Sequence, residues 1–415
     1  MLEFDPFRDT QGPDPYPLYR RLRDEAPVHH SPSADVHCVS RHEDVVAVLR
    51  DHGAFSSSAM QSVLMSADVG PLGPRSLLML ARFFWKVRTS PFRLQRAGSL
   101  VSTDPPRHDT MRRIVARGFT PRRIASWEPR ARAVVNEQLR GLGERPRFDV
   151  VRELAIPLPT TLIAELLGVE PERRDDFKRW SDAIISVVSG SARHDPVESG
   201  LLEGFGDLFG YLRGVVRRRR REPGDDLVSL LVDPRQEGVL DELGIVQFVV
   251  LLLVAGNETT TNLIGNAVHA LLDRPDALER AVSEPGRIPA LVEEALRFDS
   301  PIQVLFREAT RDVEIAGRRI PKGATVAPLL GSANRDERRY PEPDRFDLER
   351  DTSGHVAFGF GVHFCLGAAL ARLEARVALE ALLPELHRFK RAGPAAPLID
   401  SFVVRGRSSL ELEAV

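Results

Sequence analysis

Residues 355–376 read HVAFGFGVHFCLGAALARLEAR, and this stretch decides the fold expected for the whole chain. Glycines and phenylalanines crowd around Cys365, one of two cysteines in the sequence. Gly359 and Gly361 allow backbone conformations that are closed to other residues, and Gly367 leaves room just past the sulfur. A helical pattern begins at once, so we expect Cys365 at a helix N-terminus, where the helix dipole and backbone N–H groups favour a thiolate.

A single thiolate held by backbone donors suits haem iron. Iron–sulfur and zinc sites need several Cys or His ligands, and no second cysteine is near Cys365. The alternative is a buried cysteine without a ligand, which is the default for an isolated cysteine but leaves the glycine spacing without a reason. The other cysteine, Cys38, lies in a different context, so the two indicate no disulfide framework and fit a reducing cytoplasm.

The segment FGFGVHFCLG resembles the haem-binding loop of the cytochrome P-450 family, the haem-thiolate monooxygenases. The family pattern F-G-x-G-x-H-x-C-x-G is met at Phe358, Gly359, Gly361, His363, Cys365 and Gly367. The resemblance runs from DPYPLYRRLRDEAPV near the N-terminus to the last strands, with the family's motifs in order. It implies that Cys365 is the axial ligand of a haem b iron and that Phe358 packs beside its sulfur.

A second motif, EEALRFDSP, places Glu294 and Arg297 three residues apart on one face of a helix, where the two can interact. Alone, such a pair is an ordinary surface ion pair. The resemblance implies instead a structural triad, in which Glu294 and Arg297 join an arginine from the segment before the haem loop. The stretch EPDRFDLER offers Arg345 for this place.

A third motif, AGNETTTN, lies in a long helix expected over 239–272, with Ala255 and Gly256 just before Glu258 and Thr259. A threonine inside a helix can bond the carbonyl four residues back, here that of Ala255, which loosens the helix and opens a groove for oxygen and water. An acid beside a hydroxyl can then relay protons. The alternative is an apolar core helix with a threonine cluster. The resemblance implies that Glu258 and Thr259 are catalytic and that Ala255 and Gly256 lie at the haem.

Four basic side chains match the family's propionate-binding positions. In STDPPRHDTMRRIV, His108 and Arg112 are one helical turn apart and can hold one anionic group. FREATRDVEIAG supplies Arg307, and His363 lies within the haem loop. Each alone can be a solvated residue, and Arg307 can belong to an ion pair at a strand end. The resemblance implies that the four together bind the haem propionates.

Helical patterns dominate the rest of the chain, and no internal repeat or flexible linker is visible, which favours one integrated domain over 1–415. Helices are predicted over 14–25, 41–50, 75–87, 106–118, 121–141, 150–168, 171–189, 200–221, 225–232, 239–272, 287–298 and 366–383. Short strands are predicted within 27–40 and 302–328 and near the C-terminus. The resemblance implies a mainly α fold with small β-sheets, a triangular prism with haem between the long central helix and the helix after the Cys365 loop.

Composition bears on partners and location. The formal net charge of −2 does not indicate a nucleic-acid-binding surface, and RRRRR at 217–221 is interpreted as a solvated helix end. The apolar run IVQFVVLLLVAG at 245–256 is too short to span a bilayer and no export signal is visible, so we expect a cytoplasmic protein without stable membrane insertion. The stripe LLMLARFFWKV at 77–87 is expected to pack in the core or form a lid rather than touch a membrane.

The function implied by the resemblance is insertion of one oxygen atom of O2 into a lipophilic small molecule, by hydroxylation or epoxidation. Electrons are expected from NAD(P)H through a ferredoxin reductase and a ferredoxin, with the protein acting as a monomer. An acidic ferredoxin can dock by charge steering on an arginine surface formed by Arg112, Arg113, Arg117, Arg122 and Arg123. The apolar substrate cavity is expected to be lined by the segment 75–100 and by Val254, Ala255, Thr259, Val304, Leu305 and Phe402.

Other functions remain open on the sequence alone. A peroxide-driven haem-thiolate enzyme would not need the relay of Glu258 and Thr259, and an enzyme for oxidative C–C or C–O coupling would insert no oxygen. Outside the enzymes, the chain could be a haem sensor or a ligand carrier, although the oxygen-activation and propionate motifs weigh against this. A helical DNA-binding protein would leave the Cys365 loop without a reason.

Overall fold

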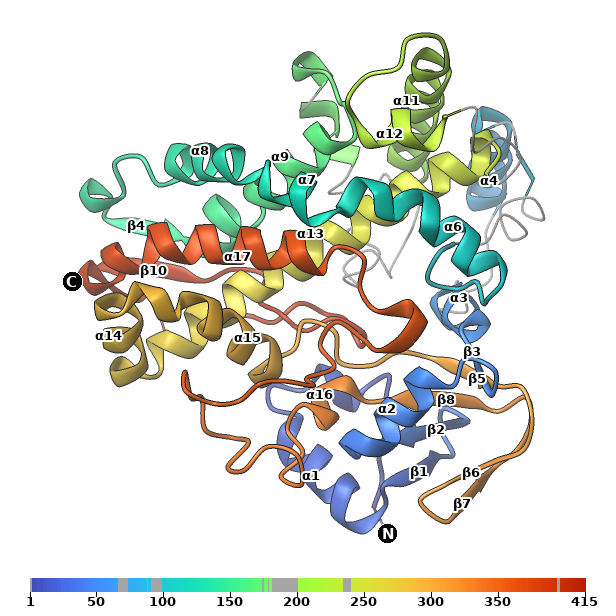
Figure 1. Ribbon diagram of the computed structural model, residues 1–415, viewed down its shortest axis with the longest axis vertical. Helices are drawn as coiled ribbons and strands as arrows, with labels where there is room; N and C mark the ends of the chain where they lie inside the picture. The colour runs from blue at the N-terminus through green and yellow to red at the C-terminus, as the bar shows by residue number, and fades with distance from the viewer. Residues whose placement is uncertain are drawn as a thin grey trace. The chain divides into compact units, whose positions relative to one another are not determined.

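The computed structural model describes residues 2–65, 74–87, 89–90, 99–173, 175–177, 179–180, 201–233, 240–393 and 396–415 (Figure 1). Within these ranges the chain is mainly α-helical with small β-sheets, as predicted from the sequence. Part of the predicted helix over 171–189, and part of the predicted cavity segment 75–100, lie outside the described residues.

The chain forms two compact units, each assembled from segments that are distant in sequence. Unit 1 comprises Met1–Met60, Ile124–Pro159 and Thr259–Val415, and unit 2 comprises Gln61–Arg123 and Thr160–Glu258. Four helices pass from one unit to the other: α3 (Ser58–Met65), α7 (Pro121–Ala125), α9 (Pro157–Leu166) and α13 (Glu242–Leu272). The prediction of a single domain over 1–415 stays a prediction.

The remaining helices divide between the units as follows. Unit 1 contains α1 (Tyr16–Glu25), α2 (His42–Arg50), α8 (Glu128–Gln138), α14 (Pro275–Ser283), α15 (Ile288–Phe298), α16 (Leu330–Ala333) and α17 (Ala368–Leu382). Unit 2 contains α4 (Pro74–Val87), α6 (Arg107–Val115), α11 (Leu201–Arg221) and α12 (Leu227–Leu231). Short 3₁₀ turns include η2 (Ala116–Phe119) and η9 (Leu383–Arg388), and η4 (Val151–Ala155) is a π-helical turn.

The described strands of the named sheets all belong to unit 1. A five-stranded sheet has the order β1 (Val28–Ser31), β2 (Val36–Val39), β8 (Thr325–Pro328), β5 (Arg307–Ala309) and β3 (Phe55–Ser56). A three-stranded sheet joins β4 (Arg147–Asp149), β10 (Glu411–Ala414) and β9 (Phe389–Arg391), and β6 (Val313–Ile315) pairs with β7 (Arg318–Ile320). The strands predicted within 27–40 and 302–328 are therefore confirmed.

The five-stranded sheet packs beneath α2, and the spacing of apolar residues explains why. Val45, Val48 and Leu49 recur at helical intervals and are buried, while Glu43 of the first turn is exposed. They belong to one core cluster with Val39 of β2 and Val326 of β8. This cluster fixes α2 against the sheet, and the C-terminal end of α2 in turn lies against the Cys365 loop.

Helix α17 packs against α8 and α15 within unit 1 (Figure 1). A closed ring of charges joins α8 to α17: Arg132 donates to Glu128 at 2.7 Å and to Glu380 at 2.6 Å, and Arg376 donates to Glu128 at 2.6 Å and to Glu380 at 3.0 Å. These side chains are partly exposed, so each pair alone contributes little, but the four together hold α17 in one register on α8.

Prolines account for two differences from the predicted helices. The predicted helix over 121–141 is divided into α7 and α8, because Pro129 has no N–H to donate to the carbonyl of Ala125 and its ring clashes there. Helix α14 was not predicted. Pro275 ends α13 as expected, but it also occupies the first position of α14, where the missing N–H costs nothing.

In unit 2, α4 confirms the short amphipathic helix predicted over 75–87. One face packs on α11, where the rings of Phe83 and Phe205 meet edge to face with centroids 6.4 Å apart. Leu78 and Trp85 are 56% and 82% exposed, so the expected core packing holds for one face only. Four of the five arginines at the end of α11 are paired with carboxylates, for example Arg217 with Glu242 at 3.2 Å, which agrees with the interpretation as a helix end at the surface.

Among the described residues, α13 is the one helix long and apolar enough to cross a membrane by length and composition. Of its most apolar 18-residue window, 56% is buried inside the protein, and a core helix passes the same test.

Candidate functional site

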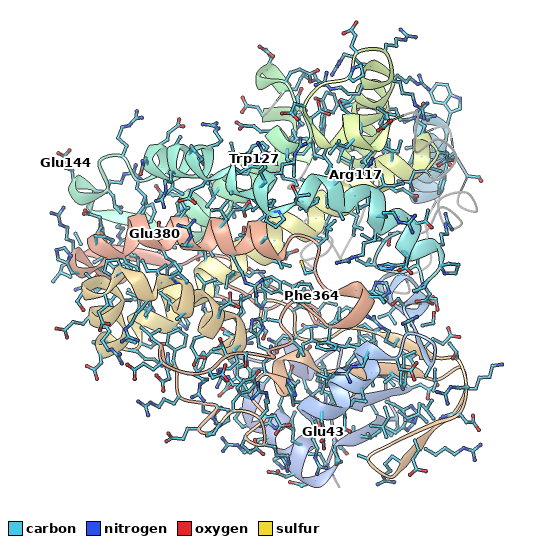
Figure 2. The ribbon with its side chains drawn as sticks, in the orientation of Figure 1. Glu43, Arg117, Trp127, Glu144, Phe364 and Glu380 are labelled. Atoms are coloured by element: carbon cyan, nitrogen blue, oxygen red, sulfur yellow. The ribbon has the colours of Figure 1, made fainter. Side chains whose placement is uncertain are left out.

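The Cys365 loop is closed by its own backbone. The Cys365 N–H donates to the carbonyl of Phe358 at 2.9 Å, and the Phe364 N–H donates to the carbonyl of Gly361 at 3.1 Å across the 3₁₀ turn η8 (Gly361–His363). Helix α17 begins at Ala368, directly after the loop, so the predicted place of Cys365 at a helix N-terminus is confirmed. Figure 2 shows the loop with Phe364, which is 39% exposed.

The loop requires glycine at two positions. Gly359 and Gly361 both have φ of +71°, in the left-handed region. A Cβ atom on Gly361 would also lie 2.9 Å from the carbonyl oxygen of Leu49 at the end of α2. Gly367 differs, because its φ is −85° and a Cβ would meet nothing within 4 Å. The space predicted just past the sulfur therefore agrees with the structure.

Gly361→Ala is expected to destabilise the folded protein by about 2–4 kcal/mol, because a positive φ and a backbone clash act together. Gly317→Ala is the matched control, since Gly317 has φ of +73° but nothing within 4 Å of the added Cβ. Urea unfolding followed by circular dichroism measures both, and the excess loss in Gly361→Ala isolates the close approach to Leu49. Equal losses in the two variants would show that this approach imposes no constraint.

Two of the four predicted propionate-binding residues lie in unit 1. Arg307 begins β5 and is 4% exposed, and the Nε2 atom of His363 lies 2.9 Å from the hydroxyl oxygen of Ser57. His108 and Arg112 lie one turn apart on α6 in unit 2, and His108 is fully buried. A common role for the four residues stays a prediction.

Glu258 and Thr259 follow one another in α13, which is α-helical from Glu242 to Leu272. Glu258 is 7% exposed, and within the described part of the chain its Oε2 atom has no hydrogen-bond partner. Burial raises the pKa of Glu258 to about 7, so near neutral pH the carboxyl can both hold and release a proton. The predicted bond from Thr259 to Ala255, and the predicted places of Ala255 and Gly256 at the haem, stay predictions.

A second buried acid lies near this motif and was missed in the sequence. Glu374 of α17 is 2% exposed and forms a hydrogen bond with Thr260 of α13. Burial raises the pKa of Glu374 to about 8, although the hydrogen bond with Thr260 acts in the opposite direction. In the sequence Glu374 stands close to Arg372 and Arg376, which makes it resemble an exposed helix position, so no pattern marked it as buried.

Glu374→Gln is expected to stabilise the protein at high pH and to change little at low pH. Folding raises the pKa of this acid from 4.5 to about 8, so the native state favours the protonated form. The stability of the native state is therefore highest below pH 4.5 and falls as the pH rises through about 8. At about 1.4 kcal/mol per pKa unit, the gain at pH 9 is about 2–5 kcal/mol.

Urea unfolding midpoints at pH 5 and pH 9 measure this effect. Glu380→Gln is the control on the same helix, because it removes a carboxylate paired with Arg132 and Arg376 and should lower stability at pH 9. If wild type and Glu374→Gln lose stability equally between the two pH values, Glu374 does not titrate as described.

The structure agrees with two of the three residues of the predicted triad. Arg297 donates to Glu294 through Nε at 2.7 Å and through Nη2 at 2.8 Å, and both side chains are fully buried. The third partner is Arg350, not Arg345: the Nε atom of Arg350 lies 3.4 Å from Glu294, and Arg350 is 8% exposed. The Arg345 side chain is 64% exposed and lies 3.6 Å from Glu342. Only its backbone carbonyl takes part, accepting hydrogen bonds from Arg297 and Arg350.

The residues predicted to line the substrate cavity have varied surroundings. Val304 is fully buried and forms a β-bridge with Leu329, and Leu305 packs against the core cluster shared by α2 and the five-stranded sheet. The Phe402 ring meets that of Phe7 edge to face at 5.0 Å. Val254 lies half-buried on α13 in unit 2. Their contact with substrate stays a prediction.

No group of three or more His, Cys, Asp or Glu side chains arranged to hold a metal ion occurs among the described residues. A structural zinc ion or an iron–sulfur cluster needs several such ligands, so the described side chains offer neither of them a site.

The chain is similar in sequence to bacterial cytochromes P-450. The family model described as Cytochrome P-450 matches residues 29–392. The putative cytochrome P-450 YjiB of Bacillus subtilis is 37% identical over 374 residues, covering 89% of this chain and 86% of that protein. Erythromycin C-12 hydroxylase of Saccharopolyspora erythraea is 40% identical over 357 residues, covering 84% of this chain and 82% of that protein.

Solved structures agree with this assignment. Cytochrome P-450 CYP109Q5 from Chondromyces apiculatus is 40% identical with a TM-score of 0.83, covering 100% of this chain and 99% of that one. CYP109E1 from Bacillus megaterium in complex with testosterone is 33% identical with a TM-score of 0.81, covering 97% of this chain and 99% of that one. The predicted fold class is confirmed. The chain therefore belongs to the cytochrome P-450 family of haem-thiolate monooxygenases.

Proposed function

We propose that this monooxygenase inserts one oxygen atom of O2 into a bulky lipophilic molecule, by hydroxylation or epoxidation. The observation that carries the proposal is the Cys365 loop, which presents one thiol at the N-terminus of α17 and is closed by the bond to Phe358. One relative is named as a hydroxylase of erythromycin, and CYP109E1 has been crystallised with testosterone and with corticosterone. A polycyclic or macrocyclic substrate from secondary metabolism is consistent with the erythromycin hydroxylase and with the two steroid complexes.

The residues of the loop fit a haem b group. Cys365 would supply the axial thiolate, Phe358 would pack beside the sulfur, and the backbone of Gly359 and Gly361 leaves no side chain in the turn before it. We propose that the propionates are held by His108, Arg112, Arg307 and His363. When bound, haem supplies oxygen activation, and a thiolate ligand favours cleavage of the O–O bond.

The chain's own residues would then handle protons. With a pKa of about 7, Glu258 can take a proton from solvent and pass it on near neutral pH. We propose that the hydroxyl of Thr259 places this proton at the oxygen, while Ala255 and Gly256 leave room for O2.

Thr259→Ala is expected to lower the yield of product per O2 consumed by about tenfold while O2 uptake continues, because proton transfer contributes about 10²–10⁴-fold when correctly placed. Product is measured by chromatography and O2 uptake by electrode. Thr259→Ser should restore coupling. Thr261→Ala is the matched control, since its hydroxyl donates to the carbonyl of Ala155 at 2.9 Å and serves packing. Unchanged coupling in Thr259→Ala would exclude the relay role.

Electrons are proposed to come from NAD(P)H through a ferredoxin reductase and a ferredoxin. Of the five arginines of the predicted docking surface, Arg113, Arg117 and Arg122 are exposed. Arg123 donates to the carbonyl of Asp225 at 2.7 Å within unit 2, so it is engaged in the fold. The three exposed arginines would steer an acidic ferredoxin.

We also propose a monomeric, cytoplasmic protein whose two compact units form a single domain over 1–415. The match of one family model to residues 29–392 supports the single domain, since that range runs through both units. Single-domain behaviour predicts one cooperative unfolding transition, seen together by circular dichroism and haem absorbance.

The experiment that tests the function combines a spectrum with turnover. Purified protein is reduced with dithionite, exposed to carbon monoxide and then assayed with ferredoxin, reductase, NAD(P)H and steroid or macrolide candidates. A strongly red-shifted Soret band and O2-dependent oxygenated product support the proposal. Equally fast turnover with peroxide alone indicates the peroxide-driven route, coupled product without added oxygen indicates oxidative coupling, and substrate binding without turnover indicates a sensor or carrier.

A further inference from the structure

A charged cluster of Glu293, His355 and Arg372 connects α15 with the two ends of the Cys365 loop. Glu293 of α15 accepts two hydrogen bonds from Arg372 of α17, at 2.6 and 2.9 Å, and its Oε2 atom lies 3.0 Å from Nε2 of His355. All three belong to unit 1. The cluster therefore joins a helix, the segment that enters the haem loop and the helix that leaves it.

Two residues of the cluster contact the side chain of Phe358. The guanidinium carbon of Arg372 lies 4.5 Å from the centroid of the Phe358 ring, a cation–π contact, and the ring of His355 lies 6.0 Å away. Phe364 of the loop meets Phe358 at 6.2 Å. The backbone of Phe358 also accepts the hydrogen bond from the Cys365 N–H, so a shift of Phe358 would be passed directly to Cys365.

The hydrogen bonds define the state of the cluster. The N–H of Ala357 donates to Nδ1 of His355 at 3.2 Å, so this nitrogen carries no proton and Nε2–H donates to Glu293. Burial would raise the pKa of Glu293, but the bonds from His355 and Arg372, together with the Arg372 charge, outweigh burial and lower the pKa to about 2. Glu293 is therefore a carboxylate at neutral pH, held by two donors in fixed geometry.

Glu293 and Glu294 are neighbours with different partners. Glu294 holds Arg297 and Arg350, which brace the irregular segment that follows α16. Glu293 contacts only the His355 and Arg372 side of the loop in the hydrogen bonds and ion pairs of the described residues. The two acids thus act on two different segments around α15.

We propose that Glu293 is a positioning residue for the haem thiolate: through Arg372 and His355 it fixes Phe358, and Phe358 fixes the backbone of Cys365. This inference rests on the proposed ligation of haem by Cys365. It assigns to the cluster a part in keeping the iron–sulfur bond intact rather than in proton transfer or substrate binding.

The test follows the red-shifted carbon monoxide band of reduced holoprotein in mild urea. The rate at which the band is lost is expected to rise about tenfold in Glu293→Gln and in Arg372→Lys. Arg372→Lys keeps the charge but loses the planar two-bond contact and the stacking on Phe358, so an effect in this variant points to position rather than charge. Glu284→Gln is the control, because it removes a carboxylate paired with Arg287 just before α15 and should leave the rate unchanged.

A double-mutant cycle with Phe358→Leu tests the route. If the cluster acts through the ring, Glu293→Gln adds little to the rate in the Phe358→Leu background. A normal band in wild type with unchanged rates in Glu293→Gln and Arg372→Lys overturns the inference alone. Additive rates in the cycle also overturn it, because the cluster would then act by another route. Absence of the red-shifted band in wild type overturns the proposed haem ligation and the inference together.

Discussion

Replacing Cys365 by histidine is expected to remove the red-shifted Soret band of the reduced, carbon monoxide-treated protein and to lower product formation to the level without enzyme. Histidine can still bind iron, so haem content should persist while the band moves to the position typical of imidazole ligation. The loss of activity would then report the loss of the thiolate rather than the loss of the cofactor. Absorption spectra and haem-to-protein ratios measure the two effects separately.

Cys38→Ala is the matched control, since Cys38 is the other cysteine of the sequence. Cys38 lies in β2, fully buried, and burial raises the pKa of its thiol well above the ordinary range. Removing one small buried side chain should cost about 1–2 kcal/mol of stability and leave the spectrum unchanged. A red-shifted band that survives in Cys365→His but disappears in Cys38→Ala would reverse the assignment of the ligand.

The Cys365 loop was predictable from sequence because its constraints are local. Gly359 and Gly361 are required by positive φ, and the apolar, alanine-rich pattern that follows requires a helix, so the place of Cys365 follows from residues within the stretch. The same holds for Glu294 and Arg297, whose spacing on one helix already brings the side chains together. Such features need no knowledge of distant segments.

The third residue of the triad, an arginine, could not be identified from local sequence. EPDRFDLER contains both Arg345 and Arg350, and the segment has no helix or strand period to say which side chain turns inward. The direction is set by backbone bonds that sequence does not reveal, such as that from Asp347 N–H to Glu294 at 2.9 Å. The resemblance suggested Arg345, and the tertiary structure selects Arg350.

Glu293 and Glu374 were missed for a related reason. Both stand on helices next to other charged residues, and a charged position in such a pattern is normally exposed. Each is drawn inward by partners from another helix or from the loop, Arg372 and His355 for Glu293 and Thr260 for Glu374. The spacing of apolar residues along a helix shows which face is buried, but it does not identify partners that come from distant segments.

Arg297→Ala is expected to destabilise the native protein by about 3–5 kcal/mol, or to prevent its folding, because it leaves the Glu294 carboxylate fully buried without its main partner. Arg297 also donates to the carbonyls of Asn334 and Pro343, both at 2.9 Å, so these acceptors lose a donor as well. The free energy of unfolding in urea, followed by circular dichroism and haem absorbance, measures the loss.

Arg345→Ala is the control that separates the corrected triad from the predicted one. Its side chain is 64% exposed, so the change should stay within about 0.5 kcal/mol of wild type. Arg350→Ala should fall between the two, because Arg350 reaches Glu294 at 3.4 Å while Arg297 remains in place. A large loss in Arg345→Ala with little loss in Arg350→Ala would restore the arginine that the sequence suggested. A small loss in Arg297→Ala would mean that water reaches Glu294, and the segment after α16 would then be held by its backbone bonds alone.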